Sequence, residues 1–275
     1  MKYRNHWIVV LAILGLTTLT FNRTSYAAPE PNPKAEPDIN ETLKSINSSF
    51  KNTEVQIINW PDKLHKRLGN LKKSAFIAFP TQRPSGKLPL LITLHGGGGK
   101  EMSLQKQLVR SSQVKGLALA ELTGKNLILL DPNSSDNWDA DTLDRMLDYV
   151  LRTYKEIDKS RIYVMGHSMG GRGTWSWILK SADRFAAAAP CGFPNGSSKE
   201  GIENLTKLPI WGMVGGDDGD NVAGIQQMTE NLRATGNVNV RHTAFPGAKH
   251  AQGNAAVFSS IELVDWMLSF SKSAR

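Results

Sequence analysis

Residues 162–173 read I-Y-V-M-G-H-S-M-G-G-R-G, and this stretch decides the fold that we expect. Its first four residues are apolar, as in a short strand buried on both faces of a parallel sheet. The next five, residues 166–170, match G-x-S-x-G, the nucleophile elbow, which places a serine on a strained turn between strand and helix. Glycine two residues before and after leaves room where a Cβ would collide with the turning backbone. Ser168 is therefore expected to project its hydroxyl beside the N-terminus of a helix.

The composition and the first residues predict an exported protein with one main domain. The chain has 275 residues, 40% of them hydrophobic, which is enough for one substantial core. Residues 1–27 resemble a cleavable signal peptide, with a basic start, an apolar run and small residues before Ala28. The apolar run is short and interrupted by threonines, so we expect a secreted or periplasmic protein without stable membrane insertion.

The charge and the cysteine content exclude some classes of partner. The formal net charge of +8 falls to +5 without the signal peptide, which is only mildly basic. Lysines and arginines between residues 63 and 73 cluster on an expected helical face, without the aromatic residues or motifs typical of nucleic-acid binding. We therefore expect no nucleic-acid partner. The single cysteine, Cys191, cannot form an internal disulfide and is expected to be buried.

The rest of the chain predicts a short N-terminal region followed by an α/β domain. Residues 28–38 form a proline-rich linker, residues 39–73 are expected to be helical, and residues 74–275 form the catalytic domain. In the last segment strands and helices alternate, which predicts a mostly parallel sheet with helices on both faces. The expected strands are 74–79, 88–94, 126–130, the one before Ser168, 185–189, 209–214 and 238–245. The expected helices are 40–51, 62–73, 101–122 with a break at Gly116, 141–155, one through Lys180, and 253–271.

A reactive serine needs a base and an orienting acid, and both are expected later in the chain. His250 lies in a glycine-containing loop between the last strand and the last helix, where such a constellation places its base. The acid is expected after the strand 209–214, among Asp217, Asp218 and Asp220. We prefer Asp218, and Asp217 remains the alternative. These acids lack the ligand spacing of a calcium loop, so no metal is expected.

An oxyanion hole requires backbone N–H donors near the reacting carbonyl oxygen. Met169, directly after the serine, is expected to supply one. Residues 95–99 read H-G-G-G-G and resemble the H-G-G-G loop that supplies the other, with Gly97 or Gly98 as the donor. A phosphate-binding loop is excluded because Glu101 stands where serine or threonine should follow the lysine.

This order of motifs resembles the α/β-hydrolase superfamily. One branch is especially similar, namely secreted polyhydroxybutyrate-depolymerase-like and feruloyl-esterase-like enzymes and the "predicted peptidases" related to them. The resemblance covers about residues 74–270 and implies an α/β-hydrolase fold with Ser168, Asp218 and His250 as its triad and no cofactor. One departure is Val214, where the family commonly has histidine. The stretches that carry the resemblance to this branch are residues 88–91, 160–163, 171–175 and 183–192.

The short interval between Ser168 and Asp218 leaves no room for a large lid, which predicts an open cleft. Trp138 and Trp175 are candidates to line it as substrate-binding residues, and a packing role is the alternative for each. The sequence thus predicts an exported serine hydrolase that cleaves small-molecule or polymer-linked carboxylic esters through an acyl-enzyme. A serine peptidase and a catalytically inactive binding protein of the same fold remain the alternatives.

Overall fold

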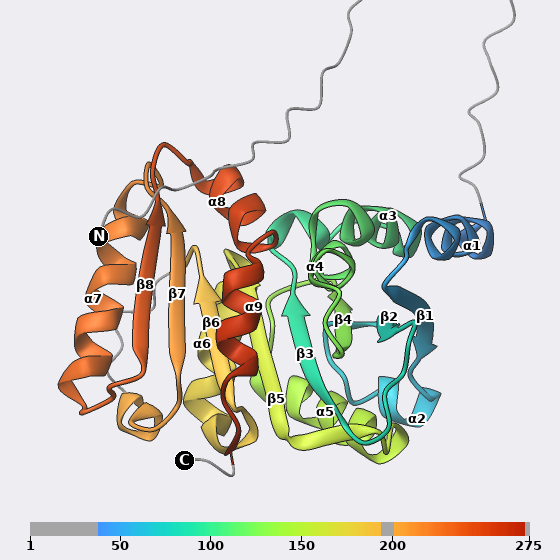
Figure 1. Ribbon diagram of the computed structural model, residues 1–275, viewed down its shortest axis with the longest axis horizontal. Coiled ribbons are helices and arrows are strands. Elements are labelled where there is room, and N and C mark those ends of the chain that lie inside the picture. Colours follow the sequence, from blue (N-terminus) through green and yellow to red (C-terminus); the bar gives the residue numbers. More distant parts are fainter. Residues whose placement is uncertain (1–37, 194–200, 273–275) are drawn as a thin grey trace, which may run out of the picture. The chain divides into compact units, whose positions relative to one another are not determined.

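The computed structural model describes residues 38–193 and 201–272, and these lie within one compact unit, Pro37–Arg275. The expected signal peptide, residues 1–27, and all of the expected linker except Asp38 lie outside the described residues. The described strands form one sheet in the order β1-β2-β4-β3-β5-β6-β7-β8 (Figure 1). β3 to β8 pair in parallel, whereas β2 pairs antiparallel with both β1 and β4. The mostly parallel sheet is therefore confirmed.

The element bounds follow the chain as alternating strands and helices. The strands are β1 Thr53–Asn59, β2 Leu71–Pro80, β3 Leu88–Leu94, β4 Ile128–Ser134, β5 Ile157–His167, β6 Ala187–Cys191, β7 Ile210–Gly215 and β8 Val240–Phe245. The α-helices are α1 Ile39–Ser49, α2 Asp62–His65, α3 Leu104–Val114, α4 Gly116–Thr123, α5 Ala140–Thr153, α6 Met169–Ser181, α7 Asp220–Ala234, α8 His250–Val257 and α9 Ile261–Leu268. Short 3-10 helices are η1 Gly97–Gly99, η2 Ala182–Arg184 and η3 Ile202–Leu205.

Helices cover both faces of the sheet, and each face has its own hydrophobic core. One core joins the sheet to α5, α6 and α7, and the other joins it to α3, α4 and α9. In Figure 1, α9 lies in front of the sheet and α6 behind it. Every residue of β3 is buried, and its side chains alternate between the cores, with Leu90 and Ile92 in the first and Leu91 in the second. The central strands are thus fixed on both faces, which holds the turns at their carboxyl ends in place.

The N-terminal region differs from the helical segment expected at residues 39–73. α1 is present, but the helix expected at 62–73 is limited to the four residues of α2, and β2 begins at Leu71. Residues 53–59, where no strand is expected, form β1 and pair antiparallel with β2. Their sequence T-E-V-Q-I-I-N is rich in β-branched residues, which favours a strand. The expected boundary at Ser74 is therefore wrong, because β2 crosses it within the same sheet.

Strand β4 is longer than the sequence indicates. Asp131 and Pro132 are expected to end it, yet the strand continues to Ser134. β3 pairs only with residues 128–130 of β4, so Pro132 lies beyond that pairing. The missing N–H of Pro132 therefore removes no hydrogen bond to β3. On the other edge of β4, Pro132 still pairs with β2.

The C-terminal part contains one helix more than expected and one helix divided in two. α7, which the sequence analysis does not anticipate, follows β7. The helix expected at 253–271 is instead α8, beginning at His250, and α9. The division occurs at Ser260, whose side chain accepts a hydrogen bond from the Leu263 N–H at 3.1 Å and caps α9. His250 therefore lies at the first position of a separate short helix.

Two further observations concern lids and membranes. The described residues between β6 and β7 contain one short element, η3. Within residues 38–193 and 201–272, no helix has the length and hydropathy needed to cross a bilayer.

Candidate active site

Ser168 lies on the turn between β5 and α6 with φ 60° and ψ −121°. Within the described residues it is the only non-glycine residue with a positive φ, so the backbone is strained at this position. A Cβ on Gly166 would overlap the backbone of Gly170, and one on Gly170 would overlap the carbonyl oxygen of Leu94. Close backbone approach therefore requires both glycines of the motif, as the sequence predicts.

The elbow is fixed to the next strand and opens the helix that follows. The Ser168 N–H donates to the carbonyl oxygen of Cys191 at 2.9 Å, and Cys191 is buried at the end of β6, as expected. α6 begins at Met169, and the Arg172 N–H donates to the Ser168 carbonyl oxygen at 2.9 Å. The N–H groups of the first turn, including that of Met169, have no acceptor within the helix and are available to an anion.

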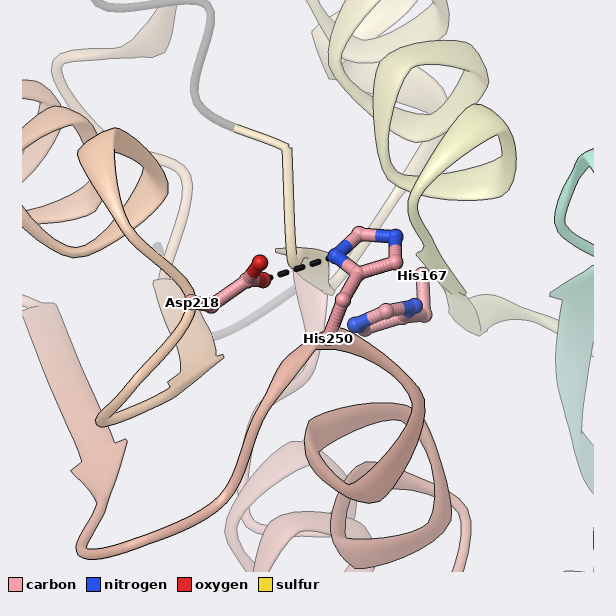
Figure 2. A group of neighbouring side chains, drawn as sticks. All are labelled: His167, Asp218 and His250. Carbon is pink, nitrogen blue, oxygen red and sulfur yellow. Dashed lines mark hydrogen bonds and ion pairs between the residues drawn. The ribbon is translucent and has the colours of Figure 1, made fainter.

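The acid and the base expected from the sequence are in contact (Figure 2). His250 Nδ1 lies 2.7 Å from Asp218 Oδ2. The Asp218 side chain is 8% exposed, whereas that of His250 is 45% exposed. Asp217 is exposed, and its N–H donates to the carbonyl oxygen of Ala248 at 2.9 Å. The structure therefore brings Asp218, and not Asp217, to His250.

Glycines allow the two loops that carry Asp218 and His250 to pack backbone against backbone. A Cβ on Gly215 would overlap the carbonyl oxygen of Ala248, and a Cβ on Gly253 would lie 2.7 Å from the Gly215 nitrogen. Val214, the position at which this chain departs from the branch it resembles, is buried in the core shared with α7. The departure is thus accommodated by packing and leaves the contact between the two loops intact.

His167, for which the sequence predicts no role, is also part of this group. His167 is buried, and its ring centroid lies 4.6 Å from that of His250 (Figure 2). Burial lowers the pKa of His167 to about 3, with a further lowering from the charges of His250 and Lys115. Its Nε2 has no hydrogen-bond partner among the described residues. A neutral imidazole thus packs against His250, and the signal for it was the residue's place directly before Ser168.

The distances within this group define what it could hold. His167, Asp218 and His250 each offer one possible ligand atom, and these atoms lie within 4.8 Å of one another. Among the described residues, these three form the group whose side chains lie close enough together to bind a metal ion. The described residues show no hydrogen bond between Ser168 and His250. His167 connects the two, because it directly precedes Ser168 in the chain and its ring contacts that of His250. Serine–histidine hydrogen bonds often tighten only when substrate binds.

The glycine loop after β3 passes beside the serine. A Cβ on Gly96 would lie 3.6 Å from Ser168 Cβ. The first 3-10 hydrogen bond of η1 runs from the Gly99 N–H to the Gly96 carbonyl oxygen at 3.0 Å. The N–H groups of Gly97 and Gly98 therefore have no acceptor within η1, which leaves both of the expected donors available.

His95 holds this loop in place. The Ser134 N–H donates to His95 Nε2 at 3.0 Å, so the proton is on Nδ1, which donates to the Gly96 carbonyl oxygen at 2.9 Å. Burial lowers the pKa of His95 to about 4. The Trp138 indole N–H donates to the His95 carbonyl oxygen at 3.0 Å, and the two rings lie 4.8 Å apart. A neutral histidine with both ring nitrogens occupied therefore anchors the loop.

The two tryptophans expected to line the cleft are both buried. Trp138 packs beneath the glycine loop through His95, and Trp175 is enclosed in the core that joins the sheet to α6. This corrects the expectation that they face an open cleft, because their apolar rings are removed from solvent by packing.

Comparison with known proteins agrees with this architecture. Residues 130–257 match the Dienelactone hydrolase family, from β4 to the end of α8. A bifunctional acetylxylan esterase/xylanase from Neocallimastix patriciarum is 30% identical over 157 residues, which is 53% of this chain and 22% of that protein. The chain thus spans about a fifth of the length of this relative.

Solved structures share the fold at low sequence identity. A thermostable esterase has a TM-score of 0.61 at 21% identity, over 82% of this chain and 64% of that one. A feruloyl esterase module from Clostridium thermocellum has a TM-score of 0.54 at 17% identity, over 77% and 94% of the two chains. The strand order, the elbow and these matches lead to one conclusion. The described domain has the α/β-hydrolase fold, and residues 130–257 of the chain match the Dienelactone hydrolase family.

Proposed function

We propose that this protein is an exported serine hydrolase that cleaves carboxylic esters with Ser168, His250 and Asp218. The observation that carries the proposal is the 2.7 Å contact between His250 Nδ1 and Asp218 Oδ2, next to a serine on a strained elbow. A carboxylate at Nδ1 selects the tautomer whose Nε2 accepts a proton, which is the form that a general base needs.

The first half of the reaction forms an acyl-enzyme. Ser168 Oγ attacks the carbonyl carbon of the ester, and His250 Nε2 takes the hydroxyl proton. The oxyanion accepts hydrogen bonds from the N–H of Met169 and from that of Gly97 or Gly98. When the tetrahedral intermediate collapses, His250 gives its proton to the leaving alcohol, and the acyl group remains on Ser168.

The second half repeats these steps with water. His250 removes a proton from a water molecule, whose oxygen attacks the acyl carbon, and the same N–H groups hold the second oxyanion. Collapse returns the proton to Ser168 and releases a carboxylic acid. Asp218 orients His250 throughout, and these steps use no metal or organic cofactor.

The ester class is supported by what the similar proteins are called. Their names include an acetylxylan esterase, feruloyl esterases and S-formylglutathione hydrolases, all of which act on carbonyl esters or thioesters. Esters attached to small molecules or to polymer chains fit the proposal. A serine peptidase of the same fold is the alternative, because one triad can open both kinds of bond.

A comparison of turnover on ester and amide substrates distinguishes the esterase from the peptidase. Amide hydrolysis also requires proton delivery to a poor leaving amine, held in register by the site. We expect kcat/KM on short-chain aryl esters to exceed that on matched aminoacyl anilides at least ~100-fold, a difference of about 2.7 kcal/mol. Comparable values would favour the peptidase.

Substitution of the nucleophile tests the chemistry itself. Ser168→Ala should reduce kcat by a factor on the order of 10⁴–10⁶ while the far-UV spectrum and the unfolding curve stay as in the wild type. A fluorophosphonate probe should label wild type at Ser168 alone. Labelling of the variant would show that another residue is the nucleophile, and absence of ester turnover in wild type would support the inactive binding protein.

Export is a separate part of the proposal. It rests on the basic and apolar character of residues 1–27 and the small residues before Ala28. N-terminal sequencing of protein recovered outside the cytoplasm should begin near Ala28. A product that retains Met1 and sediments with membranes would contradict cleavage.

A further inference from the structure

Lys115 is a buried cation that the proposed chemistry does not use. It lies at the junction of α3 and α4 and is only 5% exposed. A buried ammonium group loses its hydration, so it persists in a structure only where specific contacts compensate for the loss. The partners of Lys115 therefore indicate what holds it in this position.

Its principal contacts are with helix α8 and the residue that ends it. Lys115 Nζ donates a hydrogen bond to Asn254 Oδ1, across 139 positions of sequence. The same nitrogen lies 4.7 Å from the centroid of the Phe258 ring, a cation–π contact. Asn254 follows His250 by four residues on α8. Residues four apart share one face of a helix, so Lys115 holds α8 one turn away from His250, on the face that carries it.

Helix α8 has few side-chain contacts that could fix its position, although its backbone packs closely on the end of β7 where Gly253 meets Gly215. Of its eight residues, only Gly253 and Val257 are buried. Gly253 contributes no side chain, so a single buried apolar side chain seats the helix against the core. A short helix with so little apolar burial depends on tertiary contacts for its position. The hydrogen bond from Lys115 therefore acts together with the packing of Gly253 on Gly215 and the contact of His250 with Asp218 to set the placement of His250.

The surroundings of Lys115 connect the helix to the rest of the site. Burial lowers the pKa of Lys115 to about 7; the charge of Arg110 lowers it further, and Asp131 opposes both. Asp131 is itself buried, and accepts hydrogen bonds from Thr93 at 2.8 Å and from Ser111. The charge of Lys115 also lowers the pKa of His95 and that of His167, which lie on the two loops beside Ser168. The charge of Lys115 thus affects histidines on the glycine loop and the elbow, while its contacts are with Asn254 of α8 and with Phe258.

We propose that Lys115 is a positioning residue that places His250 for catalysis by holding α8 through Asn254. The proposal rests on the hydrolase function proposed above. Lys115 does not contact the reacting atoms in this scheme. Its effect is on where the His250 ring lies relative to Ser168 and Asp218.

Replacement by a side chain of similar length tests the proposal. We expect Lys115→Met to lower kcat on a short-chain aryl ester about 10- to 100-fold, because a displacement of about 1 Å at a catalytic group costs this much. KM should stay within about twofold, because the substrate contacts are untouched. The matched control is Lys125→Met, which removes a half-buried lysine paired with Asp265 at 2.6 Å and should leave kcat unchanged.

A double-mutant cycle identifies the hydrogen bond as the cause. Asn254→Leu should lower kcat about as much as Lys115→Met, and the double variant should be no slower than either one. Asn254→Asp, which keeps an acceptor, should retain most of the wild-type kcat. If Lys115→Met fails to fold, the two Asn254 variants still decide the matter, and equal kcat values for wild type, Asn254→Leu and Asn254→Asp would overturn the proposal.

A spectroscopic measurement separates this proposal from the function on which it rests. The proton on His250 Nδ1, held by Asp218, should give a far-downfield proton NMR signal that is lost in His250→Asn. In Lys115→Met and Asn254→Leu this signal should shift or broaden, whether or not an ester has been found. An unchanged signal with wild-type kcat in both variants would contradict positioning. Wild type that turns over no ester would contradict the hydrolase proposal alone.

Discussion

Two histidines lie on opposite sides of the nucleophile elbow and differ in how many of their ring nitrogens are hydrogen-bonded to neighbouring residues. His95 follows β3 and is buried, with one ring nitrogen accepting from Ser134 and the other donating to Gly96. His250 follows β8 and its side chain is 45% exposed; Nδ1 is engaged by Asp218, and no described residue is hydrogen-bonded to Nε2. In the sheet, β5 and its elbow lie between these two strands.

The difference assigns two roles to one type of side chain. A ring with both nitrogens occupied and a pKa lowered to about 4 stays neutral and serves as a structural anchor. A ring held at one nitrogen and open at the other can accept and return a proton. The glycine-loop side of the site is thus rigid, and the acid–base side is held by the backbone packing at Gly215 and by side-chain contacts, among them that of Lys115 with Asn254.

The largest expected effect breaks the acid–base side. His250→Asn should lower kcat by a factor on the order of 10⁴–10⁶, because Ser168 would have no base. The free energy of unfolding should change by less than about 1 kcal/mol, because the side chain is half exposed. Ester kinetics and urea unfolding of the same preparation measure both quantities. A variant that loses stability but keeps its turnover would reverse the roles given to the two histidines.

A smaller effect is expected from the acid that orients His250. Asp218→Asn should lower kcat by roughly 10³–10⁴, whereas Asp217→Asn should cost less than about tenfold because its side chain is exposed. The neighbouring aspartate serves as the matched control. A larger loss in Asp217→Asn than in Asp218→Asn would mean that the two loops pack differently in the working enzyme.

On the rigid side, substitution should act on stability first. His95→Ala leaves the buried Ser134 N–H without its acceptor and opens a cavity beside Trp138, so unfolding should become easier by about 2–4 kcal/mol. Urea denaturation at neutral pH measures the loss. The fall in kcat should be far smaller than for His250→Asn. Unchanged stability would show that the loop is held by its glycines and by Trp138 without the ring.

The smallest expected effect is the change of the free energy of unfolding with pH. His95 and His167 have folded-state pKa values lowered to about 4 and about 3, so the unfolded chain takes up protons first as the pH falls. Their contribution is complete above about pH 6.5 and is lost towards pH 3 to 4, at up to about 1.4 kcal/mol per pH unit for each proton.

One buried acid opposes this trend. The pKa of Asp131, raised to about 6 by burial, adds stability as the pH falls from 6 towards 4, but it is one group against two. The free energy of unfolding should therefore decrease between pH 7 and pH 5, and His167→Gln should flatten the slope. Equal slopes for wild type and this variant would argue against a buried neutral His167.

The sequence alone determined those features that depend on local geometry or on order along the chain. Gly166, Ser168 and Gly170 specify the elbow, because only that spacing lets the strand turn sharply into a helix. The order of serine, acid and histidine identified the His250 loop, and the alternation of strands and helices gave a mostly parallel sheet. The sequence also limited the candidates for the acid that contacts His250 to the loop after β7.

Only the tertiary structure decided which atoms meet. Asp218 contacts His250 whereas the adjacent Asp217 is exposed, so the choice between them depended on how Gly215 packs against Ala248. Burial of the two tryptophans, the pairing of β1 with β2, and the packing of His167 on His250 likewise depend on surfaces that assemble from distant segments. Lys115 and Asn254 stand 139 positions apart, and no local pattern connects them, because their contact exists only once α8 has docked beside α4.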